Sequence, residues 1–177
     1  MALYLIEANL ANVVQTKEEL DQKAVELKNK LSENNASLIE VQVSRDFSRA
    51  FFIAEAGEQE KAVEVFKGEG IEVDLVKEVR LVGKELDEVK QNNELVNYLV
   101  EWNIPSDITM DQYLARKKKN SVHYEEVPEV SFSRTYVCED MTKCLCFYDA
   151  PDEAAVKRAR EAVQTPIDSI TEILPNK

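Results

Sequence analysis

The sequence is short of glycine and of long apolar segments, and each shortage weighs against a class of protein. Four glycines in 177 residues leave little material for the glycine-rich loops that hold phosphate groups. No apolar run approaches the ~20 residues of a membrane-spanning helix, because Glu7, Asn9 and Asn12 interrupt the apolar N-terminal segment. That segment also lacks the basic flank and cleavage site of a signal peptide. We therefore expect a cytoplasmic protein without a membrane partner.

Basic residues are outnumbered by acidic ones. The chain has 22 lysines and arginines against 34 aspartates and glutamates, which gives a net charge of -12. A negative field of this size repels the phosphate backbone of nucleic acids. We therefore expect no nucleic acid among the partners.

What the sequence does contain is an internal repeat, which is the first feature to look for in a new sequence. Residues 49–56 (RAFFIAEA) align with residues 143–150 (KCLCFYDA), and residues 73–79 (VDLVKEV) align with residues 167–173 (IDSITEI). Both alignments have an offset of 94 residues. Predicted hairpins and helices follow in the same order in each copy: strands at 38–45 and 49–55 with a helix at 58–67, and strands at 130–138 and 143–149 with a helix at 152–163. The order indicates two ferredoxin-like units.

The two copies are predicted to differ in their first helix. In the first copy an amphipathic segment opens with Thr16 as cap and Glu19 three residues later. In the second copy the first strand is placed at Tyr113 and Leu114, and residues 116–130 show no apolar stripe. We therefore predict the order βαββαβ for the first copy and β-ββαβ, lacking the first helix, for the second.

The connection between the copies is predicted to be a packed helix from about residue 84 to 102. Its apolar residues differ from the Gly- and Ser-rich composition of a flexible linker, so the copies are expected to pack together. The predicted divisions are a first ferredoxin-like repeat (1–83), a connecting helix and linker (84–108) and a second repeat (109–177). Because a sheet with helices on one face leaves its other face to be covered, we expect an α+β fold of two repeats packed as a pseudo-dimeric α+β barrel. It would be a monomer with a pseudo-dimeric core, or a weak homodimer through its edge strands.

A family resemblance rests on two motifs of the second copy. These are residues 150–153 (APDE), at the start of a helix, and residues 168–173 (DSITEI), in the closing strand. With them the second copy resembles a family of ferredoxin-like bacterial domains described as nickel-binding-protein-like. The resemblance implies a place in the dimeric α+β barrel group, which includes small monooxygenases, isomerases and stress-response proteins whose sites lie inside the barrel. It also implies nickel or another transition metal as a ligand.

The cysteines are the most conspicuous candidates for chemistry. Thiolates bind nickel, zinc and copper(I), so Cys144, Cys146 and the single histidine, His123, form the candidate metal set. Alternate residues of a strand share a face, so Cys144 and Cys146 point the same way, whereas Cys138 faces away if the intervening turn is even in length. Two other interpretations stay open: small apolar residues in the sheet, or a redox or nucleophilic role. An odd number of cysteines also favours a reducing compartment.

A small-ligand pocket is the other candidate site. Arg134, Tyr136 and Tyr148 of the second hairpin have no counterpart in the first copy, where Ala54 stands in the place of Tyr148. They would give one half of the barrel a more polar, aromatic wall, although ordinary strand packing also favours aromatic residues. The basic run at 116–119 is interpreted as a solvated loop, with a phosphate patch as the alternative.

These observations favour a small binding protein for a metal ion or small molecule, with its site in or near the barrel, over an enzyme. No Ser/His/Asp signature and no His-Glu-x-x-His motif occur. The alternative is a small barrel enzyme of the monooxygenase or isomerase type. It would need an ionisable group with a shifted pKa inside a water-excluding pocket.

Overall fold

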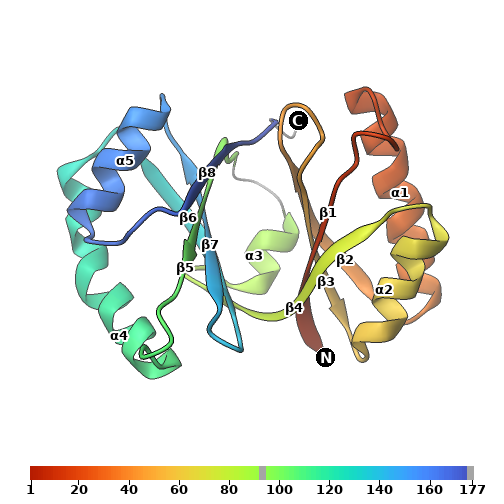
Figure 1. Cartoon of the computed structure of the whole chain (residues 1–177), viewed down its shortest axis with the longest axis horizontal. Coiled ribbons are helices and arrows are strands. Elements are labelled where there is room, and N and C mark those ends of the chain that lie inside the picture. Colours follow the sequence, from red (N-terminus) through yellow and green to blue (C-terminus); the bar gives the residue numbers. More distant parts are fainter. Residues whose placement is uncertain (92–94, 175–177) are drawn as a thin grey trace. The chain divides into compact units, whose positions relative to one another are not determined.

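The computed structural model describes residues 1–91 and 95–174, and the chain forms two compact units, Met1–Val79 and Arg80–Lys177 (Figure 1). The first elements, in chain order, are β1 (Ala2–Ala8), α1 (Lys17–Glu33), β2 (Ser37–Val43), β3 (Ala50–Ala56), α2 (Gln59–Gly68) and β4 (Val73–Val82), whose last three residues belong to the second unit. Those that follow are α3 (Leu86–Gln91), β5 (Tyr98–Asn103), α4 (Met110–Asn120), a 3-10 helix η1 (Ser121–Glu126), β6 (Ser131–Cys138), β7 (Lys143–Asp149), α5 (Glu153–Ala162) and β8 (Ser169–Glu172). Among the described residues, no helix is long and apolar enough to span a bilayer.

Each unit is an antiparallel sheet with its two main helices on one face (Figure 1). The strand order is β2-β3-β1-β4 in the first unit and β6-β7-β5-β8 in the second, which is the ferredoxin-like order in both. Helix α1 begins as predicted, because the Thr16 side chain accepts a hydrogen bond from the Glu19 N–H at 3.1 Å. Leu20, Leu27 and Leu31 form its buried stripe. The predicted α+β class with two ferredoxin-like repeats is confirmed.

The strand pairing shows that the repeat keeps one offset throughout. In the first unit Ile6 pairs with Phe52 and with Val76. In the second unit Val100 pairs with Cys146 and with Ile170. Each residue number in the second set is 94 higher than its counterpart in the first. The first strand of the second repeat is therefore β5, and the predicted shift to an offset of 109 is wrong.

The second repeat also has its first helix, contrary to the prediction. Helix α4 occupies residues predicted as strand and loop, and it begins with a capping box in which Thr109 and Gln112 bond each other's backbone N–H groups at 3.2 and 2.9 Å. Tyr113, predicted in the first strand, is its buried residue. The predicted connecting helix is likewise corrected: only α3 is helical, β5 lies within 84–108, and positions 92–94 lie outside the described residues.

The tight turns of the two hairpins are built alike. Asp46 accepts hydrogen bonds from the Ser48 N–H and hydroxyl at 3.0 and 2.6 Å, and its counterpart Asp140 accepts the same two from Thr142 at 3.1 and 2.7 Å. The residue between them has positive φ in both turns, 62° at Phe47 and at Met141. The aspartates repeat because each one satisfies the donors of a strained turn.

The Asp46 turn predicts a measurable titration. Hydrogen bonds from Ser48, and then from Ser44, lower the pKa of Asp46 to about 2. Since the folded pKa lies below the unfolded value of about 3.9, the stabilisation is present above pH 4 and is lost as the pH falls towards 2. Carboxyl-carbon NMR should show Asp46 titrating near pH 2, and the Ser48→Ala variant should return it towards the ordinary range. An ordinary pKa in the natural chain would contradict this account of the turn.

Candidate functional site

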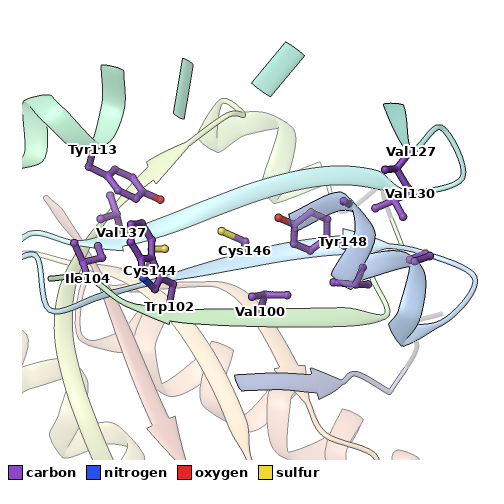
Figure 2. Packing of buried hydrophobic residues seen from close by; sticks show 14 residues of the cluster. Val100, Trp102, Ile104, Tyr113, Val127, Val130, Val137, Cys144, Cys146 and Tyr148 are labelled. Atoms are coloured by element: carbon purple, nitrogen blue, oxygen red, sulfur yellow. The ribbon is translucent and has the colours of Figure 1, made fainter. Parts of the chain in front are cut away.

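The candidate site lies in the second unit, between the sheet and helices α4, η1 and α5. Cys144 and Cys146 are buried on the helix-covered face of β7 (Figure 2). Cys146 pairs with Thr135 of β6, and Cys144 pairs with Val137. Because Val137 is opposite Cys144, Cys138 follows on the other face, as expected for an even turn. The predicted shared face of Cys144 and Cys146 is therefore present, and Cys138 is not part of it.

A buried arginine is the most unusual component of this layer. Arg160 of α5 is only 2% exposed. Its Nη1 donates to the Tyr148 hydroxyl at 3.0 Å and its Nη2 to the Pro166 carbonyl at 2.6 Å, whereas its Nε–H has no partner. In the part of the chain that the structure describes, no carboxylate forms an ion pair with it. A buried cation without a carboxylate is costly and needs a reason.

The first unit shows that the fold does not require this arginine. At an offset of 94, Phe52 corresponds to Cys146 and Phe66 corresponds to Arg160. The two phenylalanines pack edge to face with ring centroids 4.9 Å apart. The second unit thus replaces an aromatic pair by a thiol and a guanidinium in the same framework, which indicates a function for the polar pair.

Tyrosines surround the pair. The hydroxyls of Tyr124 and Tyr148 are 2.7 Å apart, and Tyr124 also stacks on Phe132 at a centroid distance of 5.3 Å. Figure 2 shows Tyr113 of α4 reaching from the helix layer towards the strands that carry Cys144 and Cys146. Burial raises the pKa of each of these three tyrosines. They therefore stay protonated and serve as hydrogen-bond donors near neutral pH.

The environment of Cys146 favours its thiolate. A hydrogen bond from the Cys144 thiol is the main cause that lowers the pKa of Cys146, and Lys117 and Arg160 add to it against the effect of burial. Thr135 donates its hydroxyl to the Cys146 sulfur at 3.3 Å. The pKa of Cys144 is raised, first by its bond to Cys146 and then by burial. Of the two thiols we assign the negative charge to Cys146, because it has the additional donor.

A small cavity connects Cys146 and Arg160 with the surface. About 20 Å³ of it is open to water-sized molecules, enough for one or two waters. Two basic residues of α4 border it. The Arg116 guanidinium lies 5.5 Å from the Trp102 ring centroid, and the Lys117 Nζ lies 4.3 Å from that of Phe132. The basic run predicted as a loop is the last turn of a helix, and two of its residues line the cavity.

The predicted ligand residues do not share one wall. Tyr148 pairs with Phe132 and lies in the helix-covered core, where it bonds Arg160. Arg134 pairs with Phe147 and Tyr136 with Leu145, so both lie on the opposite face of β6. A bulge between Phe132 and Arg134 shifts the alternation. The structure therefore places Tyr148 in the core beside Arg160, which lines the cavity, and separates it from the other two.

The predicted metal set is not brought together. His123 lies in η1, where its Nδ1 is 2.6 Å from Glu126 Oε2, and it borders a surface depression with Arg158 rather than the cavity of Cys146. Within residues 1–91 and 95–174, no group of three or more His, Cys, Asp and Glu side chains is arranged to hold a metal ion. Two buried thiols alone do not supply the donors that a nickel site of this composition would need. The residues present therefore do not fit the implied nickel ion.

Arg160 is the site residue that the sequence analysis missed. Its helix buries Ala155, Val156 and Ala159 as well, so the arginine stands on the apolar stripe. A charged residue among buried apolar ones is unusual and could have been noticed in the sequence. The repeat makes it clearer, because the equivalent residue of the first copy is the apolar Phe66. Tyr124 had no comparable signal, because η1 has no regular apolar period.

Comparison with known proteins supports the fold and the resemblance. Residues 98–173 match the family model described as "Nickel responsive protein SCO4226-like", and this span runs from the first residue of β5 to just beyond β8. The expected resemblance is thereby confirmed for the second repeat. No curated protein sequence matches the chain.

Two solved structures show the same architecture over nearly the whole chain. One is a protein provisionally assigned as chlorite dismutase TA0507, with 14% identity, a TM-score of 0.59 and coverage of 98% of this chain and 95% of that one. The other is a provisionally assigned monooxygenase from Lactobacillus acidophilus, with 10% identity, a TM-score of 0.54 and coverage of 99% and 94%. At these identities the likeness establishes the fold, an α+β chain of ferredoxin-like units, and no activity.

Proposed function

We propose that the chain is a binding protein for a small anion, which the second unit holds in the cavity beside Arg160. The observation that carries this proposal is the buried guanidinium whose Nε–H has no partner. An oxyanion with two oxygens can accept two parallel hydrogen bonds from the edge of a guanidinium. The sequence predicted either a metal ion or a small molecule as the ligand. We propose the small molecule, because the described residues do not bring a set of metal ligands together.

The cost of burying Arg160 supports a ligand as its counter-charge. A buried charge without compensation costs several kcal/mol (about 3–5 when one partner of a buried pair is missing), and the first unit avoids that cost with Phe66. The Cys146 thiolate can balance the charge while the cavity holds no anion. A bound anion would take the place of the thiolate as the counter-charge of Arg160, and its negative charge would disfavour the thiolate form of Cys146. Anion binding is therefore expected to raise the pKa of Cys146.

The shape and charge of the cavity define the class of anion. A space of about 20 Å³ suits a molecule of few heavy atoms, such as formate, better than a sugar phosphate or a nucleotide. Arg116 and Lys117 line its outer part and give it positive potential in a protein of net charge -12. The Tyr148 hydroxyl accepts a hydrogen bond from Arg160 and so helps to hold the guanidinium in position.

The test uses sodium formate as the probe. At ten times its dissociation constant, formate should add about 1.4 kcal/mol to the stability of the folded chain, which raises the Tm by about 3–6 °C for a chain of this size. Sodium chloride at the same ionic strength controls for screening.

The Arg160→Met variant is the matched control. A long apolar side chain in place of a buried charge is expected to be neutral or stabilising, so the variant should fold. Its Tm should not respond to formate. An equal response in the natural chain and in Arg160→Met, or none in the natural chain, would contradict the proposal.

A further inference from the structure

We propose that the same cavity admits small hydroperoxides and that Cys146 is the residue they oxidise, to a stable sulfenic acid. This inference rests on the cavity of the proposed function, but it concerns the sulfur rather than the anion. It gives the second unit a chemical reaction besides binding. Of the interpretations that the cysteine pattern leaves open, it favours the redox role.

The placement of the Cys146 sulfur carries the proposal. Cys146 is only 1% exposed, yet it lines the cavity together with Arg160 and Lys117. The cavity has an outer end at the exposed Ser121 of η1. A molecule of two heavy atoms can therefore reach the sulfur where a bulky thiol reagent cannot. The Thr135 hydroxyl donates to the sulfur from the opposite strand at 3.3 Å, which holds its orientation.

The other two cysteines provide an internal comparison. Burial raises the pKa of Cys138, and Cys138 does not border the cavity with Arg160 and Lys117. The pKa of Cys144 is raised, first by its interaction with Cys146 and then by burial, and Cys144 does not line the cavity. Because a thiolate and not a thiol is the nucleophile, both should react slowly. An ordinary thiol is only a few per cent ionised at pH 7, so Cys146 should react at least about tenfold faster than either.

The reaction is a two-electron oxidation of sulfur. The Cys146 thiolate attacks the distal oxygen of the hydroperoxide, an S–O bond forms, and the O–O bond breaks. The leaving hydroxide or alkoxide takes a proton from solvent in the cavity and departs as water or an alcohol. The sulfur is oxidised and the peroxide is reduced, so no other reductant or oxidant is needed.

The sulfenic acid is expected to persist because Cys144 cannot resolve it readily. Two residues apart on one strand, their Cα atoms are about 6.6 Å apart at ~3.3 Å per residue. That is at the upper end of the range for disulfides, and the parallel Cβ vectors are too far apart for the ~3.8 Å that a disulfide needs. Closing an S–S bond would require movement of β7, which lies between two paired strands.

The experiment compares chains that differ in Cys146 but keep Cys144. The Cys138→Ser variant keeps Cys144 and Cys146 together, and the Cys138→Ser/Cys146→Ser variant keeps Cys144 alone. Each is treated with hydrogen peroxide while folded, freed of peroxide with catalase, and then unfolded in dimedone for mass spectrometry. We expect a dimedone adduct on Cys146 to form at least about tenfold faster than one on Cys144, and Arg160→Met to slow it by a similar factor. Equal rates, or no adduct on Cys146, would overturn the proposal.

Two further readouts complete the test. The natural chain, oxidised in the same way, should gain one oxygen atom in mass; loss of two hydrogens, the mark of a disulfide, would overturn the assigned product. Sodium formate is tested separately on the Cys146→Ser variant, in which no thiol lines the cavity. If formate stabilises that variant but Cys146 does not react, the peroxide inference alone is wrong. If Cys146 reacts and formate has no effect, the inference is supported and the anion-binding function is wrong.

Discussion

Replacing Phe66 with arginine is expected to destabilise the first unit by about 3–5 kcal/mol, the cost of an uncompensated buried charge. Phe66 is fully buried and packs on Phe52. Arg160 occupies the equivalent position in the second unit, where the Tyr148 hydroxyl accepts a hydrogen bond from it. The first unit has Ala54 in that place. The same residue at the same place in the repeat is thus tolerated in one unit only, because only that unit has the polar surroundings.

Urea unfolding of the natural chain and of Phe66→Arg measures this difference. The Phe66→Leu variant is the matched control, since an apolar replacement of similar size costs less than about 1.5 kcal/mol. If Phe66→Arg costs no more than Phe66→Leu, the framework itself accommodates a buried arginine. The argument from the repeat to a function for Arg160 would then fail.

The repeat could be found from the sequence because the hairpins and their following helices keep both spacing and character. Asp46 and Asp140 match for a physical reason, since each one satisfies the donors of a turn with positive φ. Motifs that have to build a strained local structure survive in both copies. The order of elements from the second strand onwards was therefore predictable.

The first strand and helix of the second repeat were not predictable in the same way. β5 reads YLVEWN and is buried on both faces, and such a short apolar run cannot be assigned to strand or helix by its period. In α4 only Tyr113 is buried, so no apolar stripe marks the helix. The capping box of Thr109 and Gln112 was present in the sequence, but the chance match of Tyr113 and Leu114 to Tyr4 and Leu5 outweighed it.

The candidate site was predictable only in its strand geometry. Alternation along β7 placed Cys144 and Cys146 on one face, and the pairing of Val137 with Cys144 bears this out. Whether this face points towards the helices or towards the open side of the sheet depends on where the helices pack, and the strand pattern does not show this. The site lies under the helices rather than on the open face of the sheet. Arg160 and Tyr124 belong to α5 and η1 and reach the site only through tertiary packing. The sequence of the hairpin alone therefore does not indicate them.

Converting the second unit to the first unit's residues is expected to abolish both proposed activities without unfolding the chain. The triple variant Cys146→Phe/Tyr148→Ala/Arg160→Phe reproduces the Phe52, Ala54 and Phe66 set of the first unit. It roughly conserves core volume, which is the kind of change that cores tolerate best. It also removes a buried charge, so its stability should equal or exceed that of the natural chain.

The expected result is complete loss of the formate response and of peroxide trapping at position 146, with urea unfolding unchanged or shifted to higher denaturant. The Tyr148→Phe variant is the control, because it keeps Arg160 and Cys146 while removing one hydroxyl, and it should weaken rather than abolish the formate response. If the triple variant still responds to formate, the anion binds elsewhere. If the triple variant unfolds, the polar set of the second unit is part of its folding core, and the phenylalanine pair of the first unit is not its structural equivalent.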